Sequence, residues 1–150
     1  MIPEADFYYG AALVRLTKEL NQPISVQARP DIGAGAFDVG SRLLLLVKFC
    51  SKRLSPWTFT FPERQVEACA SHAAQKSLLL CLVCGSDGTV ALSNETAMRL
   101  LGEPRGVQSW MRASRRRREM YAVTGLGGEL ENKVADLDFE RLANALLAET

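Results

Sequence analysis

The stretch that decides the fold is FDVGSRLLLLVKFCSKRLSPWTFTF, from Phe37 to Phe61. It begins with a short strand, Phe37–Val39, turns at Gly40-Ser41 and continues as a second strand, Arg42–Cys50. The second strand is apolar at nearly every position, which is typical of a strand covered on both faces. It contains one lysine, Lys48, whose charge is costly to bury unpaired. Three explanations stay open: Lys48 pairs with an acid, meets a phosphate or ligand, or lies on the exposed side of an edge strand.

Helices and strands are predicted on both sides of this hairpin from hydrophobic spacing and from turn residues. The predicted elements are a helix at Asp6–Leu20, a strand at Ile24–Arg29, a helix from Pro62 to about Gln75, strands at Leu78–Cys84 and Thr89–Leu92, a short helix at Glu95–Leu101, strands at Val107–Met111 and Glu119–Thr124, and a last helix from Asp136 or Asp138 to Ala148. This order predicts an α/β (α+β) fold with a mixed central β-sheet flanked by helices. The apolar strands Leu43–Val47 and Leu78–Val83 are expected at its centre.

Length and composition limit the class of protein. The chain has 150 residues, which fits one domain over residues 1–150, and its 47% hydrophobic and 23% charged residues are ordinary for a soluble globular protein. The net charge of +1 gives no overall preference for nucleic acid or membrane, so only local patches bear on binding. No apolar run approaches the roughly 20 residues that span a bilayer, so no membrane association is expected. The acidic N-terminal stretch is unlike a secretory signal, and a cytoplasmic location is expected.

The order of elements around Lys48 resembles the core of the PD-(D/E)XK nucleases, the restriction-endonuclease-like fold, from Asp6 to about Leu92. In that family an acid on one strand and an acid-x-lysine on the next hold a divalent metal, for which Mg²⁺ prefers carboxylate oxygens. The lysine helps to position the attacking water and to stabilise charge on the phosphate. The triplet here is Leu46-Val47-Lys48, so the lysine matches whereas Leu46 stands where the family has an acid. The resemblance implies a divergent or inactivated Mg²⁺-dependent nuclease.

If the resemblance extends to catalysis, the carboxylates have to come from other positions. Asp38 is the candidate first acid, with Asp31 as second choice, although a tight turn at Gly40-Ser41 would pair Asp38 with Leu43. The implied catalytic set is Asp38, Lys48 and Glu63, with Asp38 and Glu63 as the Mg²⁺ ligands.

The second acid has migrated in this interpretation. Glu63, at the start of the helix after the hairpin, is the first candidate, and Glu4 and Asp6 on the first helix are the alternatives. The competing interpretation is an unrelated fold in which Lys48 is an edge or paired lysine.

The loop after the hairpin combines cations with aromatic rings. Lys52 and Arg53 precede Trp57, Phe59 and Phe61, a composition that suits a nucleic-acid surface, because cations meet phosphates and rings stack on bases. The aromatic residues also alternate with threonines, which favours the alternative that they are the inward positions of a strand. On that alternative only Lys52 and Arg53 remain as surface charge.

A run of arginines is the second basic feature. Arg115, Arg116, Arg117 and Arg118 follow Arg112 and lie between two predicted strands, so they are expected at a hairpin tip. Arginine is suited to phosphate because its guanidinium donates several hydrogen bonds in a fixed plane. These residues are predicted to contact DNA or RNA, with a solvated loop that pairs with the acidic C-terminal segment as the alternative.

Four side chains have spacings that suit zinc, namely Cys69, His72, Cys81 and Cys84. Residues three apart on a strand point to opposite faces, so Cys81 and Cys84 are not expected to chelate together, and zinc is not expected. The first hypothesis is therefore a nucleic-acid-associated, nuclease-like domain. The second is a non-catalytic protein-interaction module, in a defence, mobile-element or regulatory setting, that uses the aromatic loop and the arginine tip.

Overall fold

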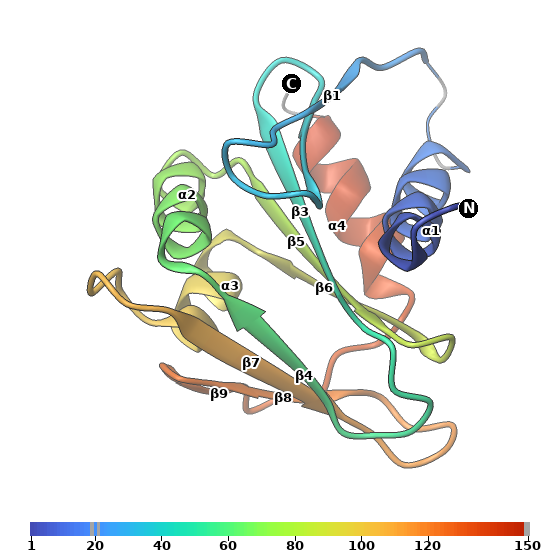
Figure 1. Cartoon of the computed structure of the whole chain (residues 1–150), viewed down its shortest axis with the longest axis vertical. Coiled ribbons are helices and arrows are strands. Elements are labelled where there is room, and N and C mark those ends of the chain that lie inside the picture. Colours follow the sequence, from blue (N-terminus) through green and yellow to red (C-terminus); the bar gives the residue numbers. More distant parts are fainter. Residues whose placement is uncertain (19, 21, 149–150) are drawn as a thin grey trace.

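The computed structural model describes residues 1–18, 20 and 22–148, which form an α+β fold (Figure 1). The elements in chain order are α1 (Glu4–Lys18), β1 (Val26–Ala28), β2 (Ala36–Val39), β3 (Leu43–Cys50), β4 (Trp57–Phe61), α2 (Glu63–Ala74), β5 (Leu78–Cys84), β6 (Gly88–Ser93), α3 (Asn94–Leu101), β7 (Ser109–Ser114), β8 (Ala122–Gly125), β9 (Gly128–Glu129) and α4 (Asp138–Leu147). The predicted fold class is confirmed. Part of the predicted first helix, residue 19, lies outside the described residues.

Sheet A is the mixed sheet that the sequence predicts, with strand order β1-β2-β3-β5-β6. β3 pairs with β5 in parallel, and the other neighbours pair antiparallel. The helix α2 lies in the crossover from β3 to β5, as a parallel pair requires a long connection. β5 is buried throughout, and β3 is buried from Leu43 to Val47. The central position predicted for both strands is confirmed.

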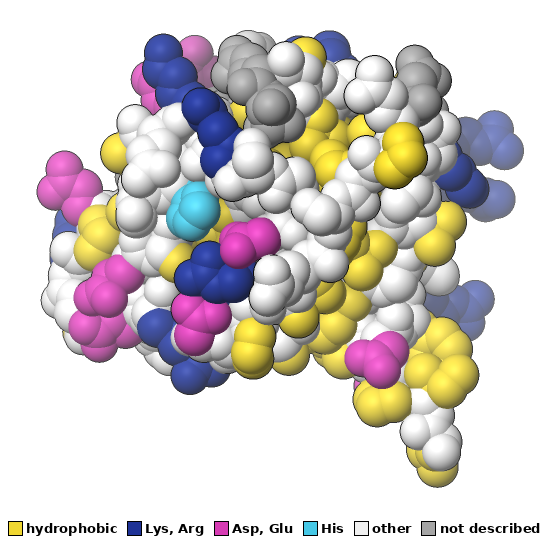
Figure 2. All heavy atoms as spheres, turned by 90° about the horizontal axis from the view of Figure 1, so that it is seen from above, with side chains coloured by type: hydrophobic (Ala, Val, Ile, Leu, Met, Phe, Trp, Pro, Cys, Tyr) yellow, Lys and Arg dark blue, Asp and Glu magenta, His cyan; other side chains and the backbone are white. Residues whose placement is uncertain are grey.

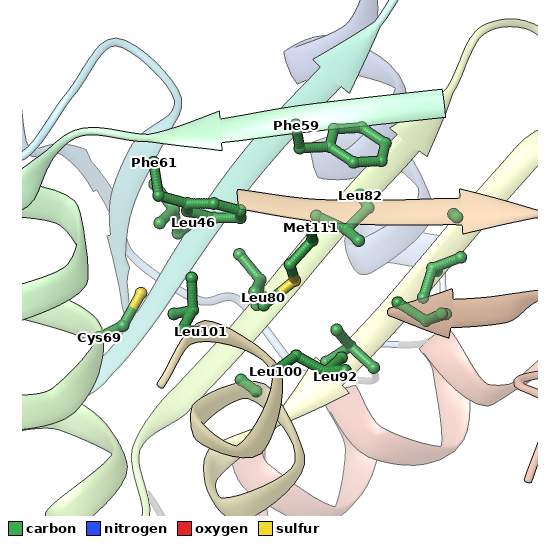
Figure 3. Packing of buried hydrophobic residues seen from close by; sticks show 14 of the residues in the cluster. Leu46, Phe59, Phe61, Cys69, Leu80, Leu82, Leu92, Leu100, Leu101 and Met111 are labelled. Carbon is green, nitrogen blue, oxygen red and sulfur yellow. The ribbon is translucent and has the colours of Figure 1, made fainter. Parts of the chain in front are cut away.

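The two faces of sheet A are covered differently. The helices α1 and α4 cover one face, where Leu45 and Val47 of β3 pack with Leu16 and Phe139. On the other face lie α2, α3 and a second sheet (Figure 1). Figure 3 shows this second core, in which Leu46 packs with side chains from β4, β5 and β7. Lys48 belongs to this second face, because it lies two residues after Leu46 on the same strand.

The second sheet, sheet B, corrects the prediction of one sheet. β4 does not join sheet A but pairs with β7, and the order is β4-β7-β8-β9. Trp57, Phe59 and Phe61 point inward and are 1%, 2% and 0% exposed. Burial of these rings is favourable because large aromatic side chains remove much apolar surface from water. The proposal that these rings form a surface for bases or for a protein partner is wrong, and the alternation with threonine was the correct signal.

The other boundaries differ by a few residues from those predicted. β7 begins at Ser109 and β8 at Ala122, so the loop between them, residues 115–121, contains the whole arginine run. The prediction of a hairpin tip is confirmed. No helix in the described part of the chain is long and apolar enough to cross a membrane.

Candidate functional site

Lys48 lies near the end of β3 and contacts the helix α2. Its Nζ donates a hydrogen bond to Oε1 of Gln65 at 2.8 Å, and it lies 5.1 Å from the centroid of the Phe61 ring. Gln65 is itself only 6% exposed. The charge is therefore stabilised by an amide dipole and by the face of an aromatic ring. The expected pairing of Lys48 with an acid is not met, since its hydrogen bond goes to the amide of Gln65.

This environment lowers the pKa of the Lys48 ammonium group. Burial lowers its pKa from 10.5 to about 8, the nearby Cys69 raises the pKa, and the positive charge of Arg64 lowers it. Burial also raises the pKa of the Cys69 thiol to about 12, so this thiol is neutral at physiological pH. Lys48 is therefore a partly buried cation at neutral pH, and its hydrogen-bond partner is not a carboxylate.

A small cavity opens beside Lys48. It has a volume of about 160 Å³, and its polar lining residues include Tyr9, Lys48, Thr58, Thr60 and Gln65. The loop of residues 30–35 closes over the same place. Gly33 lies so close to the amide of Gln65 that a Cβ there would collide with Nε2. Nε of Arg64 donates to the carbonyl oxygen of Ile32 at 3.1 Å, which ties this loop to α2.

The β2–β3 hairpin, where the resemblance places the acids, carries apolar residues at the positions nearest to Lys48. Ala36 pairs with Leu46, and both are fully buried. Asp38 pairs with Leu44, one residue nearer to Lys48 than the expected Leu43, but still farther from Lys48 along β3 than Leu46. A buried carboxylate at either apolar position would have to displace packed side chains of the second core (Figure 3).

The candidate acid Asp38 is engaged elsewhere. It forms an ion pair with Arg29 at 3.1 Å, and Arg29 pairs in turn with Asp31 at 2.9 Å. This guanidinium holds the pKa of Asp31 below its ordinary value. Asp38 and Asp31, the first and second choices for the first acid, thus share one arginine. Figure 2 shows basic and acidic side chains side by side on the face viewed from above.

The other candidate acids lie apart from Asp38. Glu63 is exposed in the first turn of α2, and Glu4 and Asp6 belong to α1, which covers the opposite face of sheet A from Lys48. Among the described residues, no three His, Cys, Asp or Glu side chains form a group that could hold a metal ion. The residues around Lys48 therefore do not fit Mg²⁺, which needs several oxygen ligands at near-octahedral positions.

Three loops meet at the end of sheet A where β3 ends. They are the β3–β4 loop, the β5–β6 turn and the arginine loop between β7 and β8 (Figure 1). Gly85 N–H donates to the carbonyl oxygen of Cys50 at 2.8 Å, and Arg115 N–H donates to Oγ of Ser55 at 3.2 Å. The loops enclose a hollow of about 620 Å³ whose lining includes Arg53, Arg115 and Arg117. Tertiary structure thus brings Arg53 of the first basic feature beside Arg115 and Arg117 of the second, with Asp87 in the same lining.

Arg115 differs from the other arginines of this basic hollow. Its Nε lies 2.6 Å from Oδ2 of Asp87, and its guanidinium lies 4.4 Å from the centroid of the Tyr121 ring. The Tyr121 hydroxyl donates to the same carboxylate at 2.7 Å. Burial alone would raise the pKa of Asp87, but the hydrogen bonds from Arg115 and Tyr121, together with the charge of Arg115, lower it below its ordinary value. Arg115 therefore fastens the loops together, and its partner is Asp87 instead of the acidic C-terminal segment.

The remaining predicted cations are exposed. Lys52 and Arg53 lie in the β3–β4 loop, and Arg116, Arg117 and Arg118 lie in the arginine loop. Arg112 is an exposed residue of β7, opposite Thr58 of β4. The structure brings Arg53 and Arg117 to one hollow, whereas Arg112 lies on the outer face of sheet B.

The cysteines and the histidine are divided among separate environments. Cys81 packs in the core beneath α1 and α4, and Cys84 packs in the core on the other face, as the strand period predicts. Cys69 is buried on α2 in the same core as Cys84, and Nδ1 of His72 lies 3.2 Å from Oγ of Ser77.

Sequence reasoning missed Gln65, which is the hydrogen-bond partner of Lys48. The available signal was its place four residues before Cys69, on the helix face that points to the core.

Comparison with protein-family models, with curated proteins and with solved structures found no match to this chain.

Proposed function

We propose that this protein is a nucleic-acid-associated domain of the nuclease-like kind that binds DNA or RNA without cutting it. The observation that carries the proposal is the basic hollow, in which Arg53 and Arg117 are brought together by three loops. Exposed arginines are suited to phosphate because they offer paired donors and remain charged at all physiological pH values.

The element order supports a relationship to the nuclease-like fold. A helix, an antiparallel hairpin, a crossover helix and a parallel strand follow one another around Lys48. Lys48 is retained on β3, whereas Ala36 and Leu46 occupy the hairpin positions nearest to it. A lysine without neighbouring carboxylates supports binding of an anion but not the assembly of a metal centre, and this favours the inactivated form of the resemblance.

Salt dependence of binding tests the proposal directly. Fluorescence anisotropy with labelled DNA and RNA oligonucleotides should show affinity that falls steeply between about 50 and about 200 mM salt, because counterions are released from phosphates. The double variant Arg53→Ala/Arg117→Ala should bind more weakly and should lower the salt slope by about one for each phosphate contact removed. Arg42→Ala, an exposed arginine at the β2–β3 turn, is the matched control. Absence of binding at low salt would refute the proposal.

Cleavage assays test the inactive character of the domain. Incubation of labelled DNA and RNA with the protein and Mg²⁺ or Mn²⁺ should leave the strands intact. Metal-dependent cleavage that disappears in both Lys48→Ala and Glu63→Ala would instead establish a nuclease and would restore Glu63 as a metal ligand.

A protein-interaction module is the second candidate, and a different surface favours it. Ile2, Phe7 and Val14 at the N-terminus and on α1 are 61%, 62% and 55% exposed, so apolar side chains face solvent there. Binding of a partner protein to this surface should be abolished in the variant Phe7→Asp/Val14→Asp and unchanged in the variant Arg53→Ala/Arg117→Ala. The opposite pattern in pull-down experiments would exclude this surface.

A further inference from the structure

We propose that the outer face of sheet B binds single-stranded nucleic acid, with Trp110 stacked on an unpaired base. This inference rests on the proposed function and names the class of nucleic acid and the surface that reads it. It concerns residues outside the basic hollow, and Trp110 in particular.

The outer face is built by the alternation of two paired strands. β4 and β7 are antiparallel, and every second side chain of each points away from the core. Trp110 lies opposite Thr60, and Arg112 lies opposite Thr58. Trp110 is 39% exposed, whereas the other tryptophan, Trp57, is 1% exposed on the inner side of the same sheet. An aromatic ring, a guanidinium and two small hydroxyl side chains thus share one pleated surface.

This face is continuous with both cationic sites. Along β7, side chains on one face are about 7 Å apart, so Trp110, Arg112 and Ser114 follow each other toward the arginine loop. Across the sheet, Thr58 and Thr60 belong to the outer face and also line the cavity beside Lys48. The face therefore borders the arginine loop at the Ser114 end of β7 and the Lys48 cavity along the edge strand β4.

The chemistry of the face favours an unpaired strand. The face of a base is accessible to an aromatic side chain only when the base is not stacked within a duplex, and stacking of this kind tolerates any sequence. The Arg112 guanidinium supplies charge complementarity to the phosphates. Across the strands from Arg112, Thr124 of β8 comes next and Glu129 of β9 follows. Glu129, which carries the first carboxylate in this direction, therefore lies at the far edge of the sheet. The central part of the face is therefore cationic and aromatic.

The inference is tested by comparing the affinities for single strands and for a duplex, in the wild-type protein and in two matched variants. Anisotropy is measured with a short oligothymidine, the corresponding oligouridine and a duplex of equal length. Both single strands should bind more tightly than the duplex, and Trp110→Ala should weaken single-strand binding by roughly tenfold or more while duplex binding changes little. Phe7→Ala is the matched control, because Phe7 is an exposed aromatic residue on α1, across sheet A from sheet B.

A second readout does not depend on affinity. Binding of oligothymidine should quench the tryptophan fluorescence of the wild-type protein, and Trp110→Phe, which keeps only the buried Trp57, should lose most of that quenching. Thermal unfolding of each variant verifies that it is folded. Equal affinity for single strand and duplex, with no effect of Trp110→Ala and no quenching, would overturn the inference. The proposed function would still stand in that case if binding depends on salt and is lost in Arg53→Ala/Arg117→Ala. Failure of the wild-type protein to bind any of the strands at low salt would overturn both.

Discussion

Lys48 and Arg115 are two partly buried cations, each beside an aromatic ring, and they are held in opposite ways. Arg115 has the carboxylate of Asp87 at 2.6 Å, and hydrogen bonding to that carboxylate raises its pKa. Lys48 has the amide of Gln65 at 2.8 Å, and burial lowers its pKa to about 8. A cation that is paired with its own acid fastens loops together, whereas the charge of Lys48 has no carboxylate hydrogen-bond partner among the described residues. The position of carboxylates, more than the position of cations, therefore distinguishes the two environments.

The largest expected effect concerns the strand position beside Lys48. Leu46→Asp should destabilise the protein by roughly 4 kcal/mol or more, because it places an unpaired carboxyl group in an apolar core and removes a packed side chain. Urea unfolding measures this change. Leu54→Asp, at a position 71% exposed in the β3–β4 loop, should change stability little. A stable Leu46→Asp protein that gains stability with Mg²⁺ would show that the site accepts a metal after all.

Removal of the acid that holds Arg115 should have an intermediate effect. Asp87→Ala should cost about 2 kcal/mol, since it leaves the Tyr121 hydroxyl without its acceptor and Arg115 without its partner. The value is moderate because the Asp87 side chain is 32% exposed and solvent screens the pair. Glu119→Ala removes the ion pair with Lys133, in which both side chains are about half exposed, and should have no measurable effect. Equal unfolding midpoints for Asp87→Ala and wild type would mean that Arg115 does not fasten the loops.

The third expected effect, no larger than that of Asp87→Ala, is a difference in pH dependence at Lys48. The unfolded chain has the ordinary pKa of 10.5 and the folded chain about 8, so between these pH values the unfolded chain binds more protons and stability rises with pH. Below pH 8 the cost of burying the charge is fully present. Wild type should therefore gain up to roughly 2 kcal/mol relative to Lys48→Met across this range, after allowance for solvent screening.

Urea unfolding at several pH values measures the difference, and Lys52→Met, at an exposed lysine, should follow the wild-type curve. Parallel curves for wild type and Lys48→Met would show that burial does not perturb Lys48.

The sequence allowed the helices, the hairpin and the central strands to be predicted because their signals are local. The continuous apolar runs of β3 and β5 indicate burial on both faces, and Pro62 suits a helix start. Sheet B was missed because Trp57 of β4 pairs with Ala113 of β7, far along the chain. The period of two in β4 correctly indicated which side chains point inward, but it carries no information about which strand lies alongside.

The candidate site divides in the same way. The amino-acid sequence by itself determined that Lys48 lies in an apolar strand without an acid two residues before it, and that basic residues precede β4 and follow β7. Only the tertiary structure decided that Gln65 receives the Lys48 hydrogen bond, that Asp38 is bound to Arg29, and that Asp87 neutralises Arg115. The physical reason is that hydrophobic periodicity is a property of neighbouring residues, whereas charge pairing is settled by which distant segments the core brings into contact.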